Sequence, residues 1–251
     1  MSPPSSAPVT RPQTTPTGTS APDGSNAPSA AALSHIASKI FTRGPLLFRL
    51  LQRFRPYICP FEELISHVPA GARILDIGCG GGLWLHLLNT TGRLASGLGF
   101  DSSTTAINLA QHASPVEPPP PEPIRTQPRL RFIHLDVRAP WPDETFDVVS
   151  IIDVLHHVPP AAQRNVIDLA CARVRPGGTL IYKDMCRRPR WRALMNRLHD
   201  LILARQWIHY APIDDVEAWA VSAGLQVERR AFFSRWWYGH ELRVFVNRGE
   251  P

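Results

Sequence analysis

Glycines concentrate in one short stretch of the chain, directly after an apolar run that carries a carboxylate. The sequence ILDIGCGGGLWL, residues 74–85, sets Asp76 ahead of glycines at positions 78, 80, 81 and 82. Glycine has no Cβ, so such a turn lets the backbone come close to a ligand. A dinucleotide-binding turn would need a small residue where Leu83 stands, and no Gly-Lys-Ser/Thr follows for a phosphate loop. The remaining pattern, D-x-G-x-G-x-G, predicts a ligand-binding turn at the carboxyl end of a strand.

Three more carboxylates follow strand-like runs. Asp101 ends GLGFD, Asp136 follows LRFIHL, and Asp153 follows FDVVSII. Because parallel strands end at one edge of a sheet, we expect all three to surround the glycine turn, an arrangement that suits a positively charged nucleoside. Asp101 stands about where α/β sites place a carboxylate on ribose hydroxyls. Structural alternatives are a helix cap at Asp76 or Asp101, and a turn at Asp136.

Strand-like runs alternate with helical patterns through the core. Strands are expected at 73–77, 95–100, 130–135, 146–152 and 179–184, and helices at 83–88, 103–111, 161–174 and near 213–223. Two final strands, 226–233 and 241–246, form a hairpin around SRWWYGH. This alternation predicts a doubly wound, Rossmann-like α/β fold with a seven-stranded, mostly parallel sheet and an antiparallel C-terminal hairpin.

Proline-rich composition marks the parts outside this core. Of the 251 residues, 26 are proline, and residues 1–31 are so rich in Pro, Ser and Thr that a disordered tail is expected. Residues 32–251 then form one domain. It comprises N-terminal helices (32–69) interrupted at Gly44-Pro45, a cofactor-binding core (70–184), and substrate-side helices with the hairpin (185–251). Residues 114–128 form a polyproline-like loop between a helix and a strand.

The motifs together carry a family resemblance. ILDIGCGGG, GFD, HLDV, FDVVSIIDVLHHV and VRPGGTLIYKDM occur in the order and spacing of class I S-adenosylmethionine-dependent methyltransferases. The chain looks most like the group that includes ubiquinone and menaquinone biosynthesis enzymes and other small-molecule methyltransferases. The resemblance covers about residues 70–184, and the hairpin more loosely.

This resemblance implies S-adenosylmethionine as cofactor and a role for each matching position. It implies that Gly78, Gly80 and Gly82 pack against the methionine and ribose, with Asp76 near the amino-acid end. Asp101 takes the ribose hydroxyls, Asp136 and the Val137 backbone hold the adenine, and Ile152 and Asp153 lie beneath the sulfonium. Cys79 and Ser102 complete the cofactor-binding set, although Cys79 can equally fill space in the turn and Ser102 can cap a helix.

The cofactor would carry an activated methyl group, so the protein must mainly align the acceptor and exclude water. A general base is needed only where the acceptor must lose a proton. His156 and His157 are the catalytic candidates, with packing or hydrogen bonding as the alternative. Position in the fold makes Lys183, Asp184, His209 and Tyr210 candidates for the acceptor pocket. No metal is expected.

The charge balance suggests partners but does not identify them. The net charge is +6 and the pI about 9.6, with arginines between apolar residues in FRLLQRFRPY and RRPRWRALMNRLHD. Solvated helix faces are the ordinary interpretation, and peripheral contact of basic amphipathic helices with an anionic membrane is the alternative. The acceptor would then be hydrophobic or amphipathic.

Other functional classes have less support. No nucleic-acid-binding motif is present, and the Asn/Asp-Pro-Pro-Tyr/Phe motif of amino-methylating nucleic-acid enzymes is replaced by IDVLHHVP. A protein or nucleic-acid methyltransferase, or a non-catalytic cofactor-binding protein, stays as the alternative. Four cysteines without a C-x-x-C pair, and no apolar run near the ~20 residues that span a bilayer, favour a reduced cytoplasmic protein. The sequence does not choose between a monomer and a homodimer.

Overall fold

The computed structural model describes residues 27–113, 130–186, 209–235 and 238–249. The first 26 residues of the expected tail, the polyproline-like loop and the basic segment 191–207 lie outside the described residues. The division of the chain at residues 32, 70 and 185 stays a prediction. No helix in the described part of the chain is both long and apolar enough to cross a bilayer.

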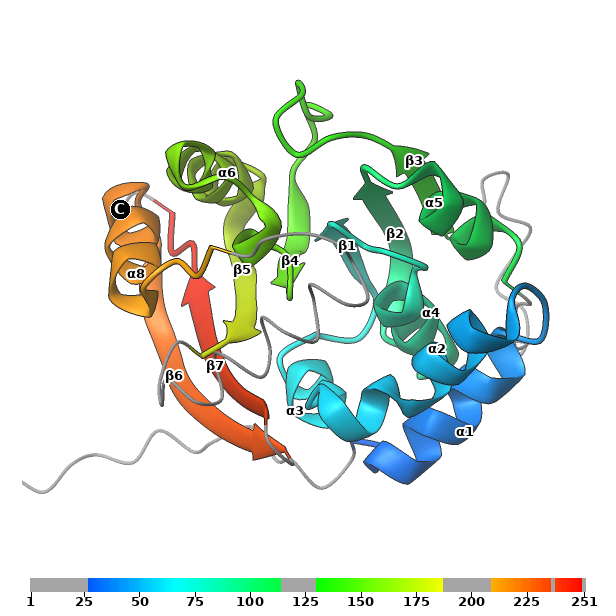
Figure 1. Ribbon diagram of the computed structural model, residues 1–251. Helices are drawn as coiled ribbons and strands as arrows, with labels where there is room; N and C mark the ends of the chain where they lie inside the picture. Colours follow the sequence, from blue (N-terminus) through cyan, green and yellow to red (C-terminus); the bar gives the residue numbers. More distant parts are fainter. Residues whose placement is uncertain (1–26, 114–129, 187–208, 236–237, 250–251) are drawn as a thin grey trace, which may run out of the picture.

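A seven-stranded sheet in the order β3-β2-β1-β4-β5-β7-β6 forms the centre of the molecule (Figure 1). Its strands are β1 (Ala72–Ile77), β2 (Leu94–Asp101), β3 (Leu130–His134), β4 (Phe146–Ile152), β5 (Val174–Met185), β6 (Gln226–Arg235) and β7 (Tyr238–Val246). The strands from β3 to β5 pair in parallel, whereas β7 pairs antiparallel with both β5 and β6. The predicted fold class is therefore confirmed, including the antiparallel hairpin.

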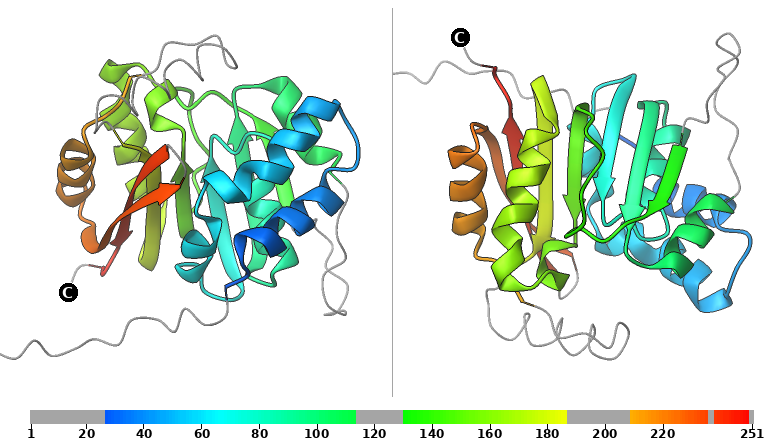
Figure 2. Two further views of the ribbon diagram at one scale, coloured as in Figure 1. Left: turned by 60° about the horizontal axis from the view of Figure 1, so that its bottom comes forward. Right: turned by 90° about the horizontal axis from the view of Figure 1, so that it is seen from above.

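Helices cover both faces of the sheet (Figure 2). One apolar core packs α1 (Ala30–Ile40), α3 (Phe61–Ser66), α4 (Leu83–Thr90) and α5 (Thr104–Gln111) against one face, and α2 (Leu46–Ile58) packs beside α1. The other core joins α6 (Pro160–Ala172) and α8 (Ile213–Ser222) to the opposite face. A 3-10 turn, η2 (Leu155–His157), follows β4. Side chains alternate along each strand, so each strand contributes to both cores.

Capping residues set where several helices begin. The Ser29 hydroxyl accepts a bond from the Ala32 amide, which starts α1 at Ala30, two residues before the expected position. The Ser103 hydroxyl accepts from the Ala106 amide and starts α5 in the same way. The short helix α3 was not expected from the sequence, because six residues give too little periodicity to detect.

The strand order places one crevice at the centre of the sheet. From β1 the chain first moves to β2 and β3 on one side, and it later places β4 and β5 on the other. Such a reversal leaves a crevice outside the carboxyl ends of the strands, where α/β proteins bind ligands. The candidate site lies here.

Candidate functional site

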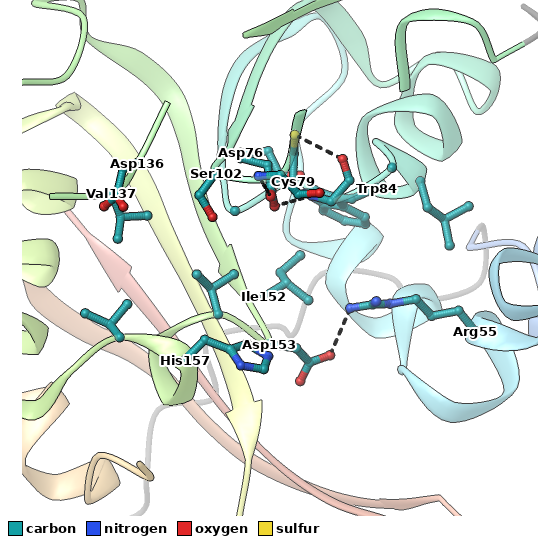
Figure 3. Close-up of a pocket in the computed structure, with 18 of the residues that line it drawn as sticks. Arg55, Asp76, Cys79, Trp84, Ser102, Asp136, Val137, Ile152, Asp153 and His157 are labelled. Carbon is teal, nitrogen blue, oxygen red and sulfur yellow. Dashed lines mark hydrogen bonds and ion pairs between the residues drawn. The ribbon is translucent and has the colours of Figure 1, made fainter. Parts of the chain in front are cut away.

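A cavity of about 640 Å³ lies at the carboxyl ends of β1, β2 and β4 (Figure 3). Most of the predicted cofactor-binding residues line it: Asp76, Gly78, Cys79, Gly80, Asp101, Ser102, Asp136, Val137, Ile152 and Asp153. Gly82 does not line it. The topology therefore brings together residues that are separated by almost 80 positions in the sequence.

Two glycines of the turn serve different purposes. Gly80 and Gly82 both have positive φ, +53° and +77°, which disfavours any residue with a side chain. A Cβ on Gly82 would lie 2.7 Å from the Phe132 ring, so Gly82 is required for packing beneath the turn. A Cβ on Gly80 would meet no protein atom within 4 Å, and Gly80 lines the cavity. The space at Gly80 is therefore available to a ligand.

Asp101 ties the end of β2 to the glycine turn. One carboxylate oxygen accepts the Gly80 amide at 2.9 Å and the other accepts the Ser103 amide at 2.8 Å. Each oxygen keeps lone pairs for further donors, because a carboxylate accepts about four hydrogen bonds. The Asp101 carboxylate is thus fixed at the cavity wall with acceptor capacity to spare.

Asp76 lies deeper, at the end of β1, and is 3% exposed. The Ser150 hydroxyl donates to it at 2.7 Å, and the Trp84 indole N–H lies 3.2 Å from that hydroxyl oxygen. Burial raises the pKa of Asp76 to about 7, although the Ser150 bond acts in the opposite direction. A cation placed in the cavity would favour the ionised form of this carboxyl group.

Asp153 has a left-handed backbone with φ of 56°, the one such non-glycine residue among those described. The Lys183 ammonium donates to both of its oxygens, at 2.6 and 2.7 Å, and Arg55 of α2 reaches one oxygen at 3.3 Å (Figure 3). Burial alone would raise the pKa of Asp153, but Lys183 and Arg55 outweigh it and hold this pKa below its ordinary value. Asp153 therefore stays ionised and paired.

Asp136 is half-exposed and forms a bidentate ion pair with Arg138, whose Nε and Nη2 donate to the two carboxylate oxygens at 2.9 and 2.7 Å. These bonds, together with the Arg138 backbone amide, lower the pKa of Asp136 to about 2.

The Cys79 side chain is not charged, since burial raises the pKa of its thiol well above the ordinary value. Cys79 is therefore an uncharged residue at the turn, and its side chain packs close to Gly99 of β2.

The two catalytic candidates differ in burial although their ring centres lie only 4.1 Å apart. His157 lines the cavity, and its pKa is lowered to about 4 by desolvation and by the adjacent His156. His156 is buried, and its Nδ1 lies 2.5 Å from an Asp184 oxygen, away from the cavity lining. Of the two neighbouring imidazoles, His157 therefore lines the cavity and His156 binds Asp184 behind it.

The four acceptor candidates do not line this cavity among the described residues. Lys183 and Asp184 are buried and hold Asp153 and His156 respectively. The His209 amide donates to the His156 carbonyl at 2.8 Å, and the Tyr210 ring centre lies 6.1 Å from that of His156.

Sequence reasoning missed a different set of lining residues. Gln52, Arg55 and Phe61 come from the N-terminal helices and line the cavity. Their helical pattern was visible, but no sequence pattern indicates that α2 lies over the end of β4.

Comparisons with known proteins identify the family of the chain. The family described as "Methyltransferase domain" matches residues 42–229. A mitochondrial ubiquinone biosynthesis O-methyltransferase of Schizosaccharomyces pombe is 31% identical over 144 residues, covering 57% of this chain and 47% of that protein. The corresponding protein of Pseudomonas putida strain F1 is 28% identical over 166 residues, covering 63% and 66%. The chain thus spans about half to two thirds of the curated relatives it matches.

A solved structure extends the likeness in fold. Magnesium protoporphyrin IX methyltransferase from Synechocystis PCC 6803, with bound SAM, superposes with a TM-score of 0.56 at 18% identity. It covers 85% of this chain and 90% of that one. At this identity the likeness concerns the fold.

Proposed function

The chain belongs to the methyltransferase-domain family, and from this premise we propose that it transfers the methyl group of S-adenosylmethionine to a small-molecule acceptor by in-line displacement. The observation that carries the proposal is the shared cavity of Gly80 and Asp101. An open glycine backbone beside a fixed carboxylate suits a ribose and a methionine chain. The bound cofactor would supply the activated methyl group.

The charges around the cavity support a sulfonium nucleoside over a dinucleotide. Two cationic side chains line the cavity, Arg55 and Arg138, and each is already paired with a carboxylate. Among the described residues that line the cavity, a pyrophosphate would therefore find no unpaired Arg or Lys. A cationic ligand would instead meet the Asp76 carboxyl group, which is partly protonated near pH 7 and can ionise to pair with it.

We propose the following division of work, carried over from the family resemblance. Asp76 receives the amino-acid end, with Gly78, Gly80, Gly82 and Cys79 forming the turn around the methionine and ribose. Asp101 with Ser102 receives the ribose hydroxyls, Val137 with Asp136 the adenine, and Ile152 with Asp153 the space beneath the sulfonium. The Asp136–Arg138 pair makes the adenine contact the least direct of these, because its carboxylate already accepts from Arg138.

The acceptor side rests on fewer residues. His157 faces the cavity as a neutral imidazole, and we propose that it accepts a hydrogen bond from the acceptor, whereas His156 positions η2 through Asp184. Lys183 orients Asp153 from below. The relatives named for ubiquinone biosynthesis support a hydrophobic or amphipathic acceptor. A cytoplasmic location, peripheral membrane contact and a monomeric or homodimeric state belong to the same proposal.

Calorimetric titration tests the cofactor. We expect S-adenosylmethionine and S-adenosylhomocysteine to bind and NAD to give no heat. Asp101→Ala should weaken the first two by roughly 10-fold to 100-fold, the cost of hydrogen bonds to a charged group. Unchanged affinity in Asp101→Ala would contradict the site. Turnover is then measured as S-adenosylhomocysteine release with a metabolite extract, and mass spectrometry should find an acceptor heavier by one CH2 group.

A further inference from the structure

The outer side of α2 exposes a run of large apolar side chains. Leu46 is 66% exposed, Leu47 63%, Leu50 39%, Leu51 46% and Phe54 48%. Large apolar side chains gathered on one helix face are unusual on a monomer surface and mark an interaction site. The only other large hydrophobics exposed in the described residues, Val221 and Phe232, lie on other elements.

These side chains form one stripe with cations beside it. At 3.6 residues per turn, positions 46, 47, 50, 51 and 54 share one side of the helix, and Arg49 and Arg53 follow along one border. Arg53 is exposed and its guanidinium lies 5.7 Å from the Phe54 ring centre. Residues 30–61 contain Lys39, Arg43 and the arginines of α2 but no acidic residue. An apolar stripe bordered by cations is the pattern of a helix lying in a bilayer interface.

The opposite side of the same helix belongs to the cavity. Gln52 and Arg55 line it, and Arg55 reaches Asp153 at 3.3 Å (Figure 3). The Phe48 ring approaches Gly81 so closely that a Cβ there would lie 2.6 Å away. A surface that contacted the outer stripe would therefore lie one helix diameter from the cavity, about 10 Å.

We propose that α2 docks this protein on an anionic lipid bilayer, with the Leu46–Phe54 stripe in the interface and Arg43 and Arg53 on lipid phosphates. Charge decides against two other occupants. A second copy of the chain would place its own Arg43 and Arg53 near those of the first copy, and these like charges would repel. Residues 187–208 of this chain carry Arg187, Arg188, Arg190, Arg192, Arg197 and Arg205 against one acid, Asp200, so they would also repel α2. An anionic surface satisfies the stripe and its cations together.

The inference sharpens the peripheral membrane contact proposed above, because it names the helix and the lipid charge, and it does not depend on methyl transfer. Docking is measured by co-sedimentation of the full chain with vesicles of phosphatidylcholine alone, and of phosphatidylcholine with one third phosphatidylglycerol. We expect binding to the second and little to the first. The variant Leu47→Ser/Leu50→Ser/Phe54→Ser should lose at least tenfold in partitioning, because it removes most of the stripe. The matched control Val221→Ser/Phe232→Ser removes equally exposed apolar groups elsewhere and should bind as wild type.

The contribution of charge is tested with Arg43→Gln/Arg53→Gln, a variant that keeps Arg55 and therefore its ion pair with Asp153. About fivefold is expected per arginine at the surface of an anionic bilayer, so the pair should lose roughly 25-fold. No binding by the wild type, or an unchanged stripe variant, would overturn the proposal. So would a dimer, seen by sedimentation velocity, that becomes monomeric in the stripe variant without any vesicle binding.

Cofactor binding separates this test from the proposed function. Each variant is titrated with S-adenosylhomocysteine, and unchanged affinity shows that the fold and the cavity are intact. Vesicle binding without affinity for S-adenosylhomocysteine would refute the proposed function and leave docking standing. The converse result would refute docking alone.

Discussion

Replacing Asp76 by asparagine should stabilise the ligand-free protein while weakening its hold on the cofactor. The carboxyl group is 3% exposed, and burial raises its pKa from 3.8 to about 7. An acid with a raised folded-state pKa binds a proton more tightly in the folded than in the unfolded chain. Stability is therefore lost as pH rises from about 4 to 7, and it stays lower above that window.

The magnitude follows from the pKa difference. About three pKa units at about 1.4 kcal/mol each give a cost of ~4 kcal/mol at pH 8. The same linkage gives roughly 1–2 kcal/mol at pH 5 and less than about 1 kcal/mol at pH 4. Asparagine is uncharged and can still accept from Ser150, so Asp76→Asn should avoid this cost. In a chain of this size the gain corresponds to a Tm higher by on the order of 10 °C at pH 8.

Differential scanning fluorimetry from pH 5 to 8 measures the effect without ligand. The control is Asp101→Asn, whose carboxylate accepts two backbone amides, and it should be less stable than wild type at every pH in this range. Titration with S-adenosylhomocysteine should show Asp76→Asn binding roughly 10-fold to 100-fold more weakly, as expected for loss of a charged hydrogen bond. A Tm difference that stays flat or reverses between pH 5 and 8 would refute the reasoning.

Three further outcomes are expected. Lys183→Met leaves the Asp153 carboxylate largely unpaired and should lower the unfolding free energy by about 3–5 kcal/mol. In denaturant titration the double variant Lys183→Met/Asp153→Asn should recover part of this loss. No recovery would contradict the pairing of the two side chains. Gly80→Ala should cost about 1–2 kcal/mol of backbone strain, and it should strongly weaken the binding of S-adenosylhomocysteine in calorimetry. Gly82→Ala should lower Tm further, because its Cβ clashes with the Phe132 ring. His157→Gln should lower turnover roughly tenfold with unchanged cofactor affinity. Because the pKa of His157 is about 4, the wild-type rate should show no inflection from this group between pH 6 and 8.

Periodicity was enough to predict the fold. Every expected strand is present, because β1, β2 and β4 are short, largely apolar runs that are mostly buried between the helices on the two faces of the sheet. Their ends were less predictable. β5 begins at Val174 and not near Thr179, since pairing of Val174 with Phe146 extends the strand through two glycines that carry no strand pattern. Such pairing depends on the neighbouring strand, which the local sequence does not record.

The cofactor side of the cavity was also predictable, because strand ends and a glycine turn fix its position. The acceptor side was not. Arg55 comes from a helix whose place over β4 is set by packing, and it meets Asp153 across 98 positions of sequence. His156 and His157 read as one motif, but η2 turns one toward Asp184 and the other toward the cavity. The two rings stay in contact, with centres 4.1 Å apart, and no spacing rule reveals which of the two is buried.

The four carboxyl groups at this edge of the sheet are compensated in three different ways. Lys183 and Arg55 neutralise Asp153, and Arg138 neutralises Asp136. Two backbone amides hold Asp101, and burial keeps Asp76 partly protonated near pH 7. A cationic ligand would pair with Asp76 as this group ionises, so binding of S-adenosylmethionine should release a proton. Calorimetry in buffers of different ionisation enthalpy measures the number of protons released on binding. In the wild type this number should decrease as the pH rises from 6 to 8, because less Asp76 is protonated before binding, and the release from this group should be absent in Asp76→Asn.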